Sequence, residues 1–140
     1  MNLRRMGWGA LIIVLILAGS AWLGTLEAQA GARQSVQGGG VTMTVTPISE
    51  PGEAPTFLVT MDTHSVNLNV YEFEEIVRLR DGQGGELPPT AVKDAQGGGH
   101  HRRATLQFAS PEPKPKSLEV VVKGVAGVPE RVFRWTVPVQ

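Results

Sequence analysis

The sequence predicts an all-β domain, an antiparallel β-sandwich of about seven strands, preceded by an apolar N-terminal helix that acts as an export signal or a membrane anchor. Three observations lead to this prediction. Beyond residue 40, apolar and polar residues alternate with a period of two in several short runs, and glycine- and proline-rich turns separate these runs. No long segment has the 3.6-residue period of an amphipathic helix. The 140 residues leave room for one such domain.

Residues 1–30 have the pattern of an export segment. Arg4 and Arg5 form a positively charged start, residues 10–18 form an apolar run, and Ala-Gln-Ala at 28–30 supplies the small residues that signal peptidase recognises. The pattern therefore predicts a signal peptide that is cleaved after residue 30.

The same segment also fits an uncleaved membrane anchor. No charged residue lies from Met6 to Leu26, a span close to the ~20 residues that cross a bilayer. In both cases the positively charged end stays in the cytoplasm and the remaining chain is exported. The domain is therefore expected in the periplasm, outside the cell, or on the outer face of the cytoplasmic membrane. Residues 31–40 contain four glycines and are predicted to be a flexible tether, which leaves 41–140 for the sandwich.

The predicted strands each present one apolar face. In chain order they cover residues 41–46, 57–61, 76–80, 90–93, 104–108, 118–123 and 132–137. Residues 66–70 continue an extended pattern, and residues 71–75 fit either a short helical turn or the approach to the next strand. Asp81-Gly82 is a strong hairpin signal, and the prolines of 87–89 place that segment at a sheet edge, because proline cannot donate to a ladder.

Three segments carry a resemblance to a known class of domains. Residues 79–84, 104–111 and 118–122 follow one another in an order similar to that of small exported bacterial immunoglobulin-like domains. The resemblance implies an immunoglobulin-like sandwich. It implies no particular activity, because such domains carry many functions. The chain has no cysteine and so lacks the Cys…Trp…Cys pattern of true immunoglobulin domains.

Composition excludes several classes of function. Without cysteine there is no thiolate catalysis, no Cys-based zinc site and no lipid-modified cysteine. The 13 Lys and Arg balance the 13 Asp and Glu, so no strong positive field favours binding to nucleic acid. A membrane contact is expected only through the N-terminal segment, if that segment stays uncleaved.

The three histidines form the only group with evident chemical content. With the strands lettered A to G, His64 lies in the B–C loop, and His100 and His101 follow a glycine run in the D–E loop. These loops emerge at one end of such a sandwich, so the imidazoles are expected to converge beside Asp62. Imidazole binds copper and zinc, a carboxylate can complete a zinc or copper(II) site, and the thioether of Met61 would favour copper(I).

Two alternatives to a metal site remain open. The polar residues can form a network that ties the two loops together, or they can simply be solvated. Adjacent residues at a strand entrance point to opposite faces, so His100 and His101 need not reach one ion. Arg102 and Arg103 allow the same division, because they can bind a carboxylate or phosphate as a pair or can form a solvated strand edge.

No enzymatic activity is expected. Asp62, His64 and Ser65 are triad residue types, but their closeness in sequence prevents them from placing a nucleophile, a base and an orienting group around one substrate. The leading hypothesis is an exported binding or interaction module of the cell envelope, whose ligand is an envelope protein or a small molecule. Its functional surface would be the histidine-bearing end. A copper or zinc carrier that uses the same histidines and a passive structural domain on a membrane anchor are the alternatives.

Overall fold

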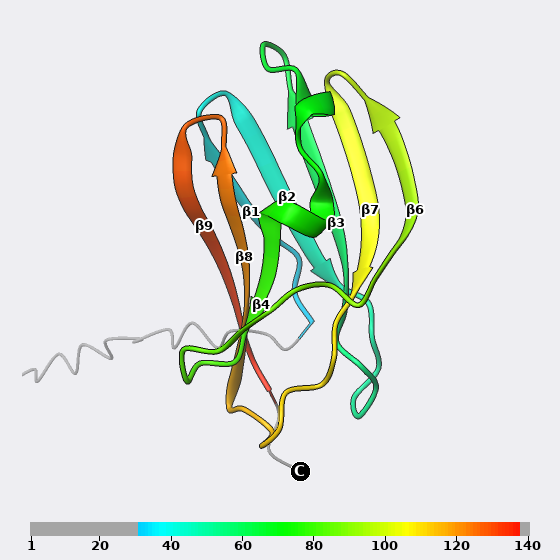
Figure 1. Cartoon of the computed structure of the whole chain (residues 1–140), viewed down its shortest axis with the longest axis vertical. Helices are drawn as coiled ribbons and strands as arrows, with labels where there is room; N and C mark the ends of the chain where they lie inside the picture. The colour runs from blue at the N-terminus through cyan, green and yellow to red at the C-terminus, as the bar shows by residue number, and fades with distance from the viewer. Residues whose placement is uncertain (1–30, 138–140) are drawn as a thin grey trace, which may run out of the picture.

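The computed structural model describes residues 31–137, which form two antiparallel β-sheets packed face to face (Figure 1). This confirms the predicted β-sandwich. The predicted signal peptide or anchor helix, residues 1–30, lies outside the described residues. Within 31–137, no helix has the length and apolar character needed to cross a membrane.

One sheet has five strands in the spatial order β1-β2-β3-β7-β6, and the other has four in the order β5-β4-β8-β9. The five-stranded sheet consists of β1 (Gln34–Gly38), β2 (Val41–Pro47), β3 (Thr56–Thr63), β6 (Ala91–Gly98) and β7 (His101–Gln107). The four-stranded sheet consists of β4 (Val77–Arg80), β5 (Glu86–Leu87), β8 (Ser117–Val125) and β9 (Val128–Thr136). A 3₁₀ turn, η1 (Leu68–Val70), and a single helical turn, α1 (Phe73–Ile76), lead from β3 to β4.

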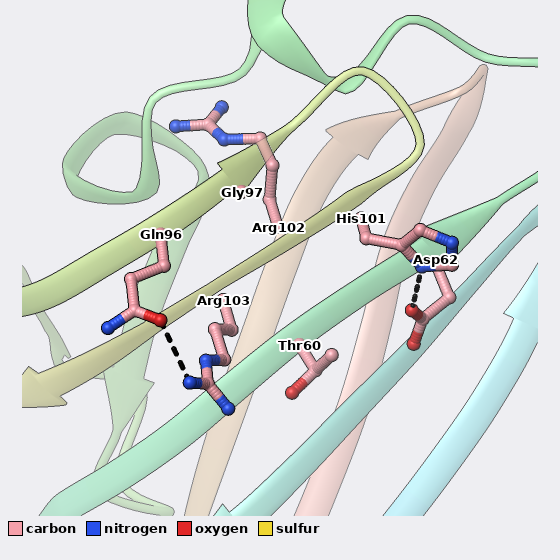
Figure 2. Close-up of a pocket in the computed structure, with 7 residues that line it drawn as sticks. All are labelled: Thr60, Asp62, Gln96, Gly97, His101, Arg102 and Arg103. Carbon is pink, nitrogen blue, oxygen red and sulfur yellow. Dashed lines mark hydrogen bonds and ion pairs between the residues drawn. The ribbon is translucent and has the colours of Figure 1, made fainter.

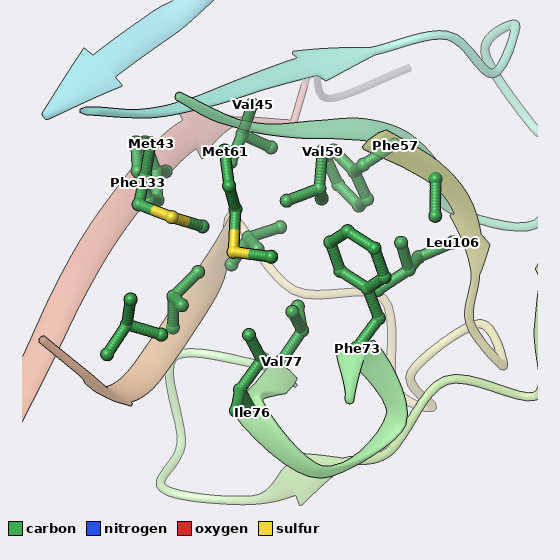
Figure 3. Close-up of a cluster of buried hydrophobic side chains, with 14 of the residues drawn as sticks. Met43, Val45, Phe57, Val59, Met61, Phe73, Ile76, Val77, Leu106 and Phe133 are labelled. Carbon is green, nitrogen blue, oxygen red and sulfur yellow. The ribbon is translucent and has the colours of Figure 1, made fainter. Parts of the chain in front are cut away.

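The core lies between the sheets and follows from the period-two pattern. Along β3, buried and partly exposed residues alternate over the whole strand, so one face packs inward and the other meets solvent. Figure 3 shows the apolar side chains of both sheets and of α1 filling this space. The ring of Phe57 lies 5.3 Å from that of Trp135 and 6.0 Å from that of Phe108, measured between centroids. The Phe57–Trp135 contact joins the two sheets, because these residues belong to β3 and β9.

The prediction of a flexible tether over residues 31–40 is wrong for residues 34–38. These residues form β1, which pairs along its whole length with β2, and Val36 packs against the core. Gly39 and Gly40 have φ values of +58° and +76° and form the two-residue connection between the strands. Positive φ at both positions is what a tight hairpin turn of this type requires. The glycines therefore make a turn, and β1 and the short β5 raise the strand number in the described residues above the predicted seven.

The segment that follows β3 also differs from the prediction. Residues 68–70 form η1 instead of an extended strand, and the side chain of Asn67 caps this turn by accepting a hydrogen bond from the Asn69 N–H at 3.1 Å. Of the two possibilities left open for residues 71–75, the helical turn is realised by α1. β6 continues through the glycine run to Gly98, so the predicted strand over residues 90–93 was too short.

Candidate functional site

The pairing of β3 with β7 brings together two of the predicted site residues. Asp62 stands directly opposite His101 in the register, although 39 positions separate them in sequence. Asp62 Oδ1 lies 2.6 Å from His101 Nδ1 (Figure 2). The side chains are 43% and 71% exposed, so the pair is formed at the surface. Both residues face outward on the five-stranded sheet.

The loops that carry the other two histidines are joined through the backbone. The N–H of Thr63 donates to the carbonyl oxygen of His100 at 3.0 Å. The hydroxyl of Thr63, a residue only 4% exposed, donates to the Gly40 carbonyl at 2.7 Å and accepts from the N–H groups of Ser65 and Val66, both at 3.2 Å. A side chain that accepts from the next N–H groups bends the chain locally. Thr63 therefore fixes the bend that carries His64, a role that the sequence analysis missed.

His100 lies in a tight turn between β6 and β7. Gly98 is opposite His101, which leaves Gly99 and His100 as the two loop residues, and the φ of +61° at Gly99 fits the first position of a type II′ turn. The Gly99 carbonyl accepts from the Leu68 N–H, and the Gly99 N–H donates to Asn69 Oδ1, both at 2.9 Å. The η1 segment is thus docked on the histidine-bearing hairpin.

His64 and His100 are exposed, and within residues 31–137 neither ring takes part in a hydrogen bond or an ion pair. In the same described range, no three His, Asp or Glu side chains are gathered closely enough to form a ready metal-binding group. Met61 is fully buried in the core, so its thioether faces away from the Asp62–His101 pair. The copper or zinc site remains a prediction.

The two arginines that follow His101 have different surroundings. The Arg102 guanidinium donates to the carbonyl oxygens of Leu68 and Tyr71 and lies over the Phe73 ring, 5.1 Å from its centroid. It therefore holds the η1 segment and is turned away from Arg103 (Figure 2). Arg103 is exposed and donates to Gln96 Oε1 at 2.8 Å. β7 lies between β3 and β6, so the predicted alternative of a solvated strand edge is wrong for both residues.

A hollow of about 300 Å³ lies on the outer face of the five-stranded sheet. Its lining comes from β3, β6 and β7 and consists of Thr60, Asp62, Gln96, Gly97, His101, Arg102 and Arg103 (Figure 2). The side chains are arranged as cross-strand pairs on one face. Arg103 lies between Thr60 and Gln96, and two positions further along β3 Asp62 lies opposite His101. Sequence reasoning did not identify Thr60 or Gln96. Thr60 could have been found as an outward position two residues before Asp62 on the same strand.

The outer face of the four-stranded sheet carries a second group of charges. Arg80 and Lys123 contact the carboxylate of Glu86 at 2.7 and 2.6 Å. The hydrogen bonds from Lys123 and Arg80 hold the pKa of Glu86 below its ordinary value. Because β4, β5 and β8 each supply one member, this group ties neighbouring strands together, and the hollow on the other sheet remains the stronger candidate site.

Comparison of the chain with protein-family models, curated proteins and solved structures yields no match.

Proposed function

We propose that the chain is an exported, non-enzymatic binding module of the cell envelope, and that the hollow around His101 and Arg103 is its ligand-binding surface. The observation that carries the proposal is the hollow itself, which collects a carboxylate, an imidazole, a guanidinium, an amide and a hydroxyl from three strands. A few polar groups that converge on a concavity are typical of a recognition site. The proposed ligand is a small polar molecule or a polar segment of an envelope protein.

Rigid support favours this surface over the loops alone. Thr60, Asp62 and His101 lie on strands that pair with neighbours on both sides, so the backbone beneath them is fixed by ladder hydrogen bonds. Arg103 and Gln96 hold each other at 2.8 Å across neighbouring strands. A ligand that meets a pre-positioned set of polar groups loses less conformational entropy on binding than one that has to order them.

The proposed location is the periplasm, the cell exterior or the outer face of the cytoplasmic membrane. It rests on the positively charged start, the apolar run and the small residues within 1–30. A cleaved signal peptide and a retained anchor both deliver the same domain to the same side of the membrane. The absence of cysteine is compatible with an oxidising compartment.

For the fold we propose an immunoglobulin-like sandwich. The order β2-β3-β7-β6 in one sheet corresponds to strands A, B, E and D of that fold, and β4-β8-β9 in the other corresponds to C, F and G. On this assignment β5 is an additional C′ strand beside C, and β1 is an extra strand before A. The chain order and the spatial order of eight strands support the proposal.

The experiment is a binding map by ¹⁵N-resolved NMR of the full chain in detergent micelles. The probes are sodium phosphate, sodium acetate, glucose and zinc chloride, each titrated separately. We expect at least one probe to shift the amide signals of Thr60, Gln96 and His101, and the shifts to be lost in Arg103→Ala or His101→Ala but retained in Lys116→Ala. Lys116 is an exposed residue remote in sequence from the hollow.

A protein ligand is tested by photo-cross-linking in envelope fractions of the native host. A photo-reactive side chain at position 60 should give a discrete cross-linked product, and the same group at position 136, an exposed threonine position on β9, should not. If no probe shifts the hollow and position 60 gives no product beyond that of position 136, the binding function is overturned in favour of a passive structural domain.

A further inference from the structure

The Asp62–His101 contact fixes which imidazole nitrogen is free. An ionised carboxylate can only accept hydrogen bonds, so the ring nitrogen that faces it at 2.6 Å, Nδ1, carries the proton. In a neutral ring the other nitrogen, Nε2, then keeps its lone pair. With 71% of the His101 side chain exposed, that lone pair is open to a ligand from solvent. Metal-binding histidines are held in the same way, by a carboxylate on the nitrogen that does not bind the metal.

His64 is the imidazole best placed to join His101. β3 ends at Thr63, and His64 is the exposed first residue of the bend that follows, two positions after Asp62. The hydroxyl of Thr63 fixes the bend at this point, and its N–H ties it to the carbonyl of His100.

The position of His100 differs. Its carbonyl is bonded to Thr63, whose side chain faces inward, and residues directly opposite each other in an antiparallel pair share a face. His100 is thus displaced toward the other side of the sheet from His101. This makes it a natural internal control, since it is an exposed imidazole next to the site in sequence.

We propose that this end of the five-stranded sheet binds a divalent transition-metal ion through His101 Nε2 and the His64 imidazole, with Asp62 as the positioning residue and water in the remaining positions. The inference rests on the proposed function, because Asp62 and His101 also line the hollow, and it adds a metal ion to the ligands proposed there. Nitrogen donors select copper(II) and zinc, and copper(II) binds such sites more tightly than zinc does. Met61, the one methionine in β3, is directed into the core, which favours copper(II) over copper(I) at the outer face.

The backbone segments that carry His64 and His101 are already held next to each other, because the Thr63 N–H donates to the carbonyl of His100. The β3–β7 ladder and the Thr63 hydrogen bonds hold the two backbone segments together in the folded protein, so the metal ion does not have to order them. The nearest guanidinium on the same face, that of Arg103, is held by Gln96 in the neighbouring row. The carboxylate of Asp62 adds a negative charge that favours a cation at His101.

The test is a titration of the tag-free, metal-stripped full chain in detergent micelles with copper(II), followed by calorimetry and electron paramagnetic resonance. We expect one equivalent of copper(II) with hyperfine coupling to imidazole nitrogen, and weaker binding of zinc at the same stoichiometry. His101→Ala and His64→Ala should each remove the imidazole coupling and weaken binding at least about tenfold. His100→Ala should keep both the affinity and the spectrum.

The role of Asp62 has its own signature. Asp62→Ala should weaken copper(II) binding by about 10- to 100-fold, as expected when the group that orients a ligand is removed, while the stoichiometry and the melting temperature stay unchanged. The metal site is overturned by binding that is indifferent to His101 or His64, by an equal loss in His100→Ala, or by the absence of stoichiometric binding. If metals fail but phosphate, acetate or glucose shifts the hollow in the NMR map, the binding function stands without the metal. If no probe binds and the photo-cross-link at position 60 gives no specific product either, both fail.

Discussion

The side-chain amide of Gln34 exchanges two hydrogen bonds with the backbone of Arg134. Its Nε2 donates to the Arg134 carbonyl at 2.6 Å, and its Oε1 accepts from the Arg134 N–H at 3.2 Å. The residues are 100 positions apart and belong to different sheets. β9 is an edge strand, and an amide that offers both a donor and an acceptor takes the place of a neighbouring strand there. β1 thereby connects the edge of the five-stranded sheet to the edge of the four-stranded sheet.

Gln34→Ala should therefore lower the free energy of unfolding by about 1 kcal/mol, the usual net worth of such hydrogen bonds when water can partly replace them. Urea denaturation followed by circular dichroism measures the change. Gln37→Ala, at an exposed position of the same strand, is the matched control and should change stability by less. Equal losses in the two variants would show that the Gln34–Arg134 contact does not stabilise the fold.

The buried Arg131 links β9 to β1 at the other end of β1, where Gly38 lies. The residue is 2% exposed, and its guanidinium donates to the carbonyls of Val125 at 3.0 Å and Gly38 at 2.6 Å. Burial lowers the pKa of Arg131 from its ordinary value. Arg131→Ala should destabilise the fold by at least about 2 kcal/mol, because it strands two carbonyls and leaves a cavity.

Arg131→Met separates these two effects. Methionine fills most of the space of the arginine stem but donates no hydrogen bond. The free energy of unfolding of Arg131→Met should therefore lie between those of the native protein and Arg131→Ala. Urea unfolding of the three proteins gives the order. A methionine variant as unstable as the alanine variant would mean that the hydrogen bonds to Gly38 and Val125 account for the whole effect.

Arg102 and Arg103 offer a comparison between neighbours. Arg102 donates to two carbonyls at the η1 segment. Arg103 is exposed, and within residues 31–137 the one side-chain hydrogen bond of its guanidinium goes to Gln96. Arg102→Lys should speed hydrogen exchange at the Leu68 and Tyr71 amides, because a lysine amine cannot reproduce the forked contact. Arg103→Lys should leave both amides unchanged. Equal exchange in the two variants would contradict the role of Arg102 as a clamp.

The strands of the core were predictable because their signal is local. Val41, Met43 and Val45 alternate with threonines, and Phe133 and Trp135 stand on either side of Arg134, so the buried face of each strand can be identified without reference to its partner. The meeting of the two histidine loops was also predictable, because the order of strands in a sandwich brings alternate loops to one end. The backbone bond between Thr63 and His100 realises this proximity.

The remaining features depend on contacts between distant segments. β1 has the composition of a linker and becomes a strand only because β2 pairs with it and Gln34 reaches β9. Residues 68–70 carry an extended pattern but turn, because Arg102 bonds the carbonyl of Leu68 at the start of this stretch and that of Tyr71 just beyond it. The Asp62–His101 pair depends on the exact register between β3 and β7, and a shift of one residue would turn the two side chains to opposite faces.

The charged group on the four-stranded sheet should make stability depend on acid pH. Hydrogen bonds from Lys123 and then Arg80 lower the pKa of Glu86 below the ordinary value of 4.5. The ionised carboxylate thus stabilises the folded state above the unfolded pKa, and this contribution is lost as the pH falls through the folded pKa. The difference in melting temperature between the native protein and Glu86→Gln should shrink from pH 7 toward pH 3. Glu112→Gln, at an exposed loop position, should show no such convergence.

Gly97 and Gly99 flank the approach to the histidines, and both have positive φ, +83° and +61°. An alanine at either position costs about 1–2 kcal/mol from backbone strain alone. At Gly97, however, the added Cβ would lie 2.1 Å from the carbonyl oxygen of His101, whereas at Gly99 no atom lies within 4 Å. Gly97→Ala should therefore be the more destabilising variant in urea unfolding, because β6 and β7 have to separate.

That separation should also disturb the site, because His101 would be displaced from its position opposite Asp62. The amide signals of Asp62 and His101 are expected to shift strongly in Gly97→Ala and weakly in Gly99→Ala in ¹⁵N-resolved spectra. Equal cost and equal shifts in the two variants would mean that backbone strain alone governs these glycines. The close approach of β6 to His101 would then have no part in holding the Asp62–His101 pair.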